Sequence, residues 1–257
     1  MRVRIAEVVV VCAAFAAPAY ADVTFTMKVR DALSKAAGER TDYFAGHKLR
    51  SDVNVGGERR SMIVDADTGQ LVLLDPEKRI ATVVDLQSLS AGLRQTVPGT
   101  LEPLVTATPR TRQLAGVTCT VHDLKMTIPP SPDQPMSIVL TGSACLAKGG
   151  PGAADVSEFY RAAAEKGLVF GDPSAPTEPA PAVMMTALYK ALLARGVPLA
   201  TDVKMGFEAT GAMADLLKQM GASAQARATT TETVSVSAAA LPPSMFEIPD
   251  GYQVVKV

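Results

Sequence analysis

The chain is poor in the residues on which several common functions depend. Its 257 residues include no Trp, five Tyr, seven Phe and only two His. With 25 Lys and Arg against 26 Asp and Glu, the formal charge is −1. Proteins that bind nucleic acids need a basic surface, and many also stack bases on aromatic rings. We therefore expect no nucleic-acid partner for a chain that is otherwise of ordinary globular composition, 47% hydrophobic and 20% charged.

The sequence also lacks the motifs of common catalytic and metal centres. Residues 142–145, Gly-Ser-Ala-Cys, are not the Gly-x-Ser-x-Gly turn of a serine hydrolase. Asp-x-Asp-x-Gly at 65–69 begins like a calcium loop, but Gln70 and Pro76 stand where that loop needs Gly and Glu. We interpret it as a hairpin turn. We expect no enzymatic activity, no bound metal and no cofactor.

The first 21 residues have the layout of a secretory signal peptide. Arg2 and Arg4 precede an apolar run of ten residues, 8–17, and Ala-Tyr-Ala at 19–21 supplies a cleavage site. A membrane anchor or a buried helix is the alternative, but spanning a bilayer takes about 20 apolar residues. We expect the mature chain to begin at Asp22 and to lie in the periplasm, or outside the cell where there is no outer membrane.

Two of the three cysteines remain after that cleavage. Cys12 follows two valines rather than the small residues of a lipoprotein signal, so we assign it to the removed segment. Cys119 and Cys145 then form an even pair in an oxidising compartment, which favours a disulfide. A hairpin symmetric about Pro132 would place them directly opposite one another. A metal site is the alternative, but the sequence has no Cys-x-x-Cys spacing.

Most of the chain alternates in the manner of short β-strands. Such segments occupy residues 23–29, 43–55, 60–64, 70–74 and 79–85. Because most of their connections are too short for a parallel crossover, these segments should form one antiparallel meander. The pattern resumes near Leu104 and continues through the cysteine hairpin, and a last strand lies around residues 230–237.

Helical periodicity appears later in the chain. Predicted helices span residues 86–95, Asp155 to Gly167, Pro181 to Gly196 and Met213 to Gly221. Residues 171–182 contain four prolines and should form an extended connector. Helices with a single apolar stripe need a surface to cover, and the inner face of the sheet is available. We therefore predict one α+β domain over residues 22–257.

Two features have both a structural and a functional interpretation. In the predicted hairpin, His122 shares a face with Leu124 and Met126, which favours a hydrogen-bonded core histidine over a catalyst. The C-terminal half is rich in methionine. On a helix stripe methionine usually fills a core, although it also suits a groove that adapts to apolar ligands.

Several short strings resemble one protein family. Thr111-x-x-Leu114-Ala115-Gly116-x-x-Cys119-x-x-His122 is similar to a Gly-x-x-Cys-x-x-Tyr strand of an uncharacterised secreted family that belongs with the lipoprotein carriers LolA and LolB. Three further strings follow in that family's order: Pro151-Gly152 with Phe159-Tyr160, Gly196-Val197-Pro198-Leu199, and Phe246-x-Ile248-Pro249-x-Gly251-Tyr252. The resemblance implies an incompletely closed antiparallel β-barrel, a half-barrel, with helices packed on its concave face and an apolar interior. His122 stands where the relatives usually have Tyr.

These observations lead to one main hypothesis and two rivals. The main one is a monomeric, non-enzymatic binding protein of the cell envelope that holds a lipid or an acylated protein. The ligand would be lined by Phe159, Tyr160, Met184, Leu188 and Leu192. The first rival is a structural or interaction protein with an envelope protein partner and a barrel filled by its own side chains. The second is a hydrolase, which would need His47 or His122 beside a Ser and an Asp.

Overall fold

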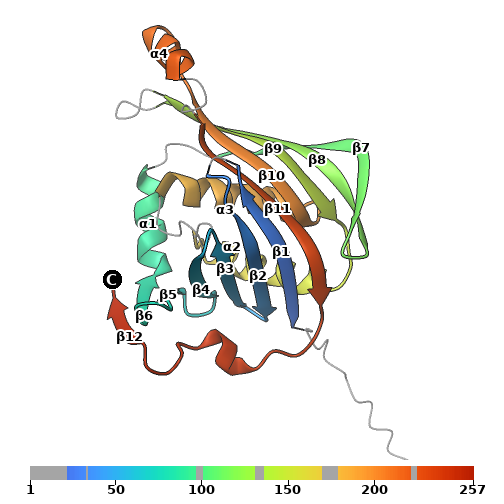
Figure 1. The fold of residues 1–257 in the computed structure, drawn as a ribbon, viewed down its shortest axis with the longest axis vertical. Coiled ribbons are helices and arrows are strands. Elements are labelled where there is room, and N and C mark those ends of the chain that lie inside the picture. The colour runs from blue at the N-terminus through green and yellow to red at the C-terminus, as the bar shows by residue number, and fades with distance from the viewer. Residues whose placement is uncertain (1–21, 33, 97–100, 131–135, 170–178, 221–224) are drawn as a thin grey trace, which may run out of the picture.

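A computed structural model describes residues 22–257 except 33, 97–100, 131–135, 170–178 and 221–224 (Figure 1). The described residues form one 12-stranded sheet whose edges are β12 and β7, so the sheet is open. The predicted signal peptide, residues 1–21, lies outside the described part of the chain. Among the described helices, none combines the length and the apolarity that crossing a membrane requires.

The strands and helices have the following bounds. The first half contains β1 (Val23–Asp31), β2 (Ala37–Ala45), β3 (Lys48–Val55), β4 (Glu58–Asp65), β5 (Gln70–Asp75), β6 (Ile80–Asp85), α1 (Leu86–Thr96), β7 (Leu104–Leu114) and β8 (Val117–Ile128). The second half contains β9 (Ser137–Ala147), α2 (Ala153–Glu165), α3 (Pro179–Leu193), β10 (Val197–Glu208), α4 (Ala212–Met220), β11 (Gln225–Ser237), the 3-10 helix η2 (Pro243–Phe246) and β12 (Gln253–Lys256).

The strand order joins the two halves of the chain. It runs β12-β6-β5-β4-β3-β2-β1-β11-β10-β9-β8-β7, so the N-terminal strand β1 pairs with β11. The predicted meander from β1 to β6 is present and antiparallel. The expectation of an entirely antiparallel sheet is wrong at one edge, where β12 runs parallel to β6. A short terminal strand can pair in parallel because a long connection separates it from its neighbour.

Local turn chemistry explains the hairpins. The predicted strand over residues 43–55 is two strands, β2 and β3, which reverse at Gly46 and His47. Between β3 and β4, Gly56 and Gly57 have φ angles of 65° and 88°, the positive values that a two-residue hairpin turn of the favoured twist requires. The predicted turn after β4 is also present, with the side chain of Asp65 accepting hydrogen bonds from the amides of Asp67 and Thr68.

The strand β10 was not expected from the sequence, because Pro198 follows Gly196 and indicates a break. The structure accommodates Pro198 at a register shift between β10 and β9, where the ladder does not need its missing N–H. Helix α3 also begins earlier than expected, at Pro179, inside the predicted connector. A proline is tolerated in the first helical turn for the same reason, since the amides of that turn have no partner within the helix.

The predicted disulfide between Cys119 and Cys145 is confirmed, and the two Cα atoms are 5.3 Å apart. The predicted register is wrong by two residues, because Val121 rather than Cys119 lies opposite Cys145. The two cysteines therefore meet on a diagonal. A shift by an even number of residues leaves every side chain on its original face, which is why the bridge still forms. The predicted centre, Pro132, lies outside the described residues.

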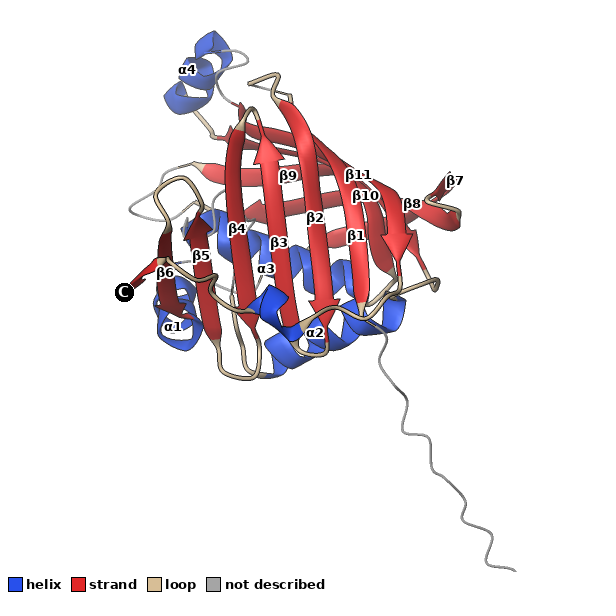
Figure 2. Ribbon diagram, turned by 60° about the horizontal axis from the view of Figure 1, so that its bottom comes forward, coloured by secondary structure: helices blue, strands red, loops and turns tan. Residues whose placement is uncertain are grey.

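Both faces of the sheet carry buried side chains. On one face of β2, β3 and β4, Phe44, Leu49 and Met62 form a core with Phe159 of α2. On the opposite face of β4, Ile63 packs with residues from η2 and the segment after it, Phe246, Ile248 and Tyr252. A second core joins α3 to β8 and β9 through Met184, Leu188, Leu192, Leu124, Met126 and Leu140. Helices α2 and α3 thus each share a buried core with strands of the sheet (Figure 2).

Candidate functional site

A pocket of about 280 Å³ lies between α2, α3 and the sheet. We call it the helix pocket. The sheet contributes Arg40, Leu49 and Met62, helix α2 and the turn after it contribute Ser157, Tyr160, Arg161, Ala163, Ala164 and Leu168, and helix α3 with its end contributes Met185, Thr186, Tyr189, Lys190, Leu193 and Ala194. Most of these side chains are apolar or aromatic, and the charged ones are cationic.

Helix α2 has one face that packs against the sheet and an adjoining face that lines the helix pocket. Val156, Phe159 and Ala162 are buried against the sheet, and Phe159 has no exposed surface. The ring of Phe159 packs against the ring of Phe44 on the sheet, and the two ring centroids are 5.7 Å apart. Burial of such a side chain stabilises the fold by about 1.5–3 kcal/mol. The adjoining face, which begins at Ser157, is left to line the helix pocket.

The residues predicted to line a ligand are divided between the pocket and the core. Tyr160 is on the pocket wall. Phe159 belongs to the core beneath α2, whereas Met184, Leu188 and Leu192 belong to the core beneath α3. Each of these four is at most 1% exposed.

Of the residues of α3 and its end that line the helix pocket, three come one position after the buried stripe and repeat at the same spacing. They are Met185, Tyr189 and Leu193, and the other three, Thr186, Lys190 and Ala194, follow one position later still. The rings of Tyr189 and Tyr160 are stacked with centroids 5.2 Å apart, and this contact joins α3 to α2 at the pocket. The helical period in the sequence indicated only the stripe of Met184, Leu188 and Leu192, and that stripe is packed in the core beneath α3.

Arg40, which lines the helix pocket, forms an ion pair that was not expected from the sequence. Arg40 of β2 binds Asp42 through two hydrogen bonds of 2.7 and 2.8 Å, and Ser51 of β3 donates to the same carboxylate at 2.5 Å. All three residues are buried. Burial of an ion pair costs much of what the attraction supplies, so a pair at this position is weak support for stability alone. The Arg-x-Asp spacing on one strand face was the available signal.

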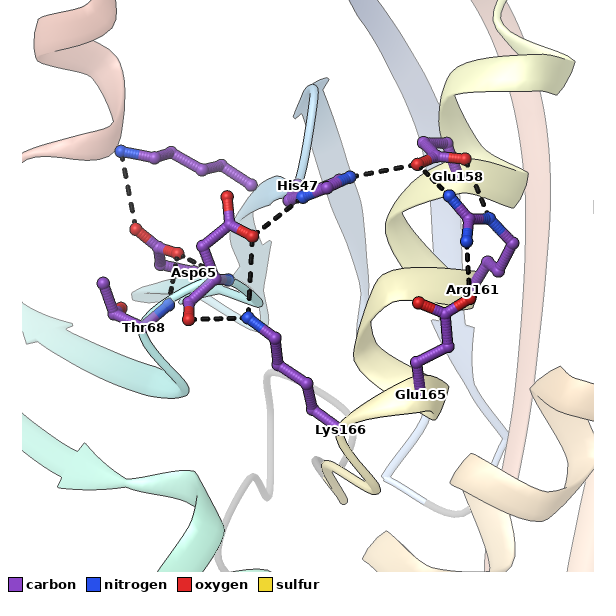
Figure 3. A network of polar contacts seen from close by, with 9 residues as sticks. His47, Asp65, Thr68, Glu158, Arg161, Glu165 and Lys166 are labelled. Carbon is purple, nitrogen blue, oxygen red and sulfur yellow. Dashed lines mark hydrogen bonds and ion pairs between the residues drawn. The ribbon is translucent and has the colours of Figure 1, made fainter.

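A second polar network holds α2 to the turns of the sheet (Figure 3). Nδ1 of His47 lies 2.9 Å from a carboxylate oxygen of Asp67, and Nε2 lies 3.0 Å from one of Glu158. Glu158 also accepts from Arg161, a residue of the pocket wall, and Lys166 donates to the carbonyl oxygen of Asp67 at 2.7 Å. His47 therefore links the β2–β3 turn, the β4–β5 turn and α2.

The carboxylates around His47 change the pKa values within this network. Hydrogen bonding to Asp67, and then to Glu158, raises the pKa of His47 above its usual range. The pKa of Asp67 is lowered chiefly by its hydrogen bond to His47. The pKa of Glu158 is lowered first by Arg161 and second by His47. The arrangement favours a charged imidazolium between two ionised carboxylates.

The second histidine has the surroundings that the sequence predicted. His122 is 7% exposed, and its Nδ1 lies 2.9 Å from the carbonyl oxygen of Thr120. It occupies the same face of β8 as Leu124 and Met126. Among the described residues, no contact joins the ring of His122 or of His47 to a serine.

Comparison with solved structures finds distant similarities, of which two are described. No family model and no curated protein matches the chain. An uncharacterized conserved protein from Thermus thermophilus is 9% identical, with a TM-score of 0.40, over 93% of this chain and 91% of that one. The structure of PNGF-II is 8% identical, with a TM-score of 0.38, over 92% of this chain and 31% of that one.

Proposed function

We propose that this protein is a non-enzymatic binding protein of the cell envelope that holds an apolar ligand, a lipid or an acylated protein, between its sheet and its helices. The helix pocket carries the proposal. Its walls are mostly apolar, and its volume of about 280 Å³ is close to the lower end of the range for small-molecule sites, about 300–1,000 Å³.

The proposed architecture is a half-barrel with helices on its concave face. The open 12-stranded sheet supports it, as do the cores beneath α2 and α3. The ion pair between Arg112 of β7 and Glu232 of β11 supports strong curvature, because three strands separate β7 from β11 in the sheet. The resemblance to the secreted family related to LolA and LolB agrees with this architecture.

An extracytoplasmic location is part of the proposal. The disulfide between Cys119 and Cys145 would persist in an oxidising compartment. The basic, apolar and small-residue order of residues 1–21 is that of a cleavable leader. Together they support a periplasmic location.

The rival, a protein whose interior is filled by its own side chains, has one observation in its favour. Four of the five residues predicted to line a ligand are packed in the cores. The remaining space in the helix pocket is what separates the two functions. The acyl chain of a lipid has to enter this pocket in one case, and the pocket stays empty of ligand in the other.

The test is calorimetric titration of the protein with dodecanoate. Ala164 is an exposed residue of α2 that lines the pocket, so Ala164→Phe places a ring at its wall. We expect the affinity to fall at least about tenfold, which corresponds to about 1.4 kcal/mol. The matched control is Ala91→Phe, at an exposed position of α1 that does not line the helix pocket. Binding that is absent in the wild type, or equally strong in both variants, would overturn the proposal.

A further inference from the structure

A second depression, polar and more open, adjoins the helix pocket. Its volume is about 1050 Å³, and it lies between the start of α2, the end of α3 and the strands β7 to β9. We call it the basic groove. Three residues, Ser157, Leu193 and Ala194, line both the groove and the helix pocket.

The two depressions follow one path along the helices. The residues of α2 that line the groove are Ala153, Ala154 and Ser157, and those of the pocket continue with Tyr160, Arg161 and Ala164. These positions recur at intervals of three and four residues, so they form one stripe of the helix. A molecule that lies along this stripe would pass from the pocket to the groove over Ser157, Leu193 and Ala194, the residues that line both.

The groove carries positive charge only. Its charged residues are Lys148 and Arg195, both exposed, and none of the described residues that line it is acidic. It also reaches Ala153, the first residue of α2, where the helix dipole is positive. Asp155, the acid of the first turn, is 6% exposed and is not on the groove wall.

His122 supplies an independent sign that the groove receives a polar group. The residue is 7% exposed and lines the groove, and its Nδ1 is engaged by the carbonyl oxygen of Thr120. Within the described part of the chain, its Nε2 has no hydrogen-bond partner. Because Nδ1 donates to a carbonyl oxygen, this tautomer leaves Nε2 as an acceptor, which suits a hydroxyl or N–H group of a ligand.

We propose that the basic groove holds the anionic head group, a carboxylate or a phosphate, of an amphiphile whose acyl chain occupies the helix pocket. Lys148 and Arg195 would contact the head-group oxygens. The inference rests on the proposed function, because it assigns the remaining half of the same ligand. It narrows the ligand class from any apolar molecule to one with a single charged end.

The test compares two ligands that share a tail. Calorimetric titrations use dodecanoate and 1-dodecanol against the wild type and the double variant Lys148→Gln/Arg195→Gln. The matched control is Lys28→Gln/Arg30→Gln, which removes two exposed charges of β1 from outside the groove. Inorganic phosphate and acetate are titrated alone as head groups without a tail.

We expect the groove variant to bind dodecanoate about three- to tenfold more weakly, as the loss of two partly screened ion pairs implies, and to bind 1-dodecanol unchanged. The control variant should bind both ligands like the wild type.

Each contrary outcome has a separate meaning. If both ligands bind equally to the wild type and to the groove variant, the head-group assignment is wrong while the proposed function stands. If neither ligand binds, the proposed function fails and the assignment fails with it. If phosphate or acetate alone binds as tightly as dodecanoate and this binding is lost in the groove variant, the groove is a separate anion site, and the assignment is overturned.

Discussion

His47 has a carboxylate beside each ring nitrogen, and the two carboxylates come from distant parts of the fold. Asp67 lies on the β4–β5 turn, 20 residues away in sequence, and Glu158 lies on α2, 111 residues away. Since Glu158 also binds Arg161 of the pocket wall, the charge on His47 influences how firmly α2 is held beside the pocket.

This arrangement predicts a dependence of stability on pH. The pKa of His47 is raised in the folded state, so its contribution is full below the unfolded value of about 6.5 and is lost as the pH rises through the folded value. Between pH 6 and 9 we expect the wild type to lose up to about 1 kcal/mol of unfolding free energy relative to His47→Gln, a small figure because solvent screens the partly exposed side chains. Urea titrations across this range measure the loss. Parallel curves for the two proteins would contradict it.

The buried pair of Arg40 and Asp42 predicts a coupled effect on stability. Arg40→Met leaves the Asp42 carboxylate buried without its partner, which should cost about 3–5 kcal/mol of unfolding free energy. The double variant Arg40→Met/Asp42→Asn should recover most of this, because the amide is neutral and still accepts from Ser51.

The exposed ion pair of Arg60 and Glu58 is the matched control for these variants. Arg60→Met should cost less than about 1 kcal/mol, because both side chains are more than half exposed. Urea denaturation of the four proteins provides the comparison. If Arg40→Met lowers the unfolding free energy no more than Arg60→Met does, the buried ion pair does not have the expected effect on stability.

The sequence predicted some residues well and others not at all. The disulfide and the buried His122 could be predicted because both depend on a single hairpin and its alternation. The contacts of His47 could not, because its partners are brought together only by the packing of α2 on the sheet. The pair of Arg40 and Asp42 was missed because the predicted strand began at residue 43.

At the scale of elements, two adjacent stripes of α3 have different surroundings. The stripe of Met184, Leu188 and Leu192 is buried, and the stripe one position later faces the helix pocket. The adjacent leucines Leu192 and Leu193 therefore belong to different environments, although their chemistry is the same.

Those two leucines give a matched prediction. Leu192→Ala should cost about 2–5 kcal/mol of unfolding free energy, because it leaves a cavity in the core beneath α3. Leu193→Ala should cost clearly less, because part of its side chain already faces the pocket, and it should alter dodecanoate binding instead. Urea denaturation and calorimetry measure the two effects. A reversed order of stabilities would show that the helix is rotated from the orientation described.

Other elements were predicted to the extent that local signals determine them. The strands of the first meander follow from alternation and turn residues, and α1, α2 and α4 follow from helical periodicity. The strand β10 was missed because Pro198 resembles a strand breaker until its bulge is known. The parallel pairing of β12 was missed because a four-residue strand has no periodicity of its own to identify its neighbour.

At the scale of the whole molecule, the pairing of β1 with β11 makes one sheet from both halves of the chain. The helices that lie between β9 and β10 in sequence can therefore pack across strands from both halves. The helix pocket forms where they do not fill the space completely. We propose that this space holds the acyl chain of a lipid.

The most direct test is to purify the protein from the envelope of its own cells, extract it with organic solvent and identify the extract by mass spectrometry. We expect an acyl-chain lipid in a molar amount comparable to that of the protein. The Ala164→Phe variant, prepared in the same way, should carry much less of this lipid. An extract without lipid, from protein that also fails to bind added dodecanoate, would contradict the proposal that the helix pocket holds an acyl chain.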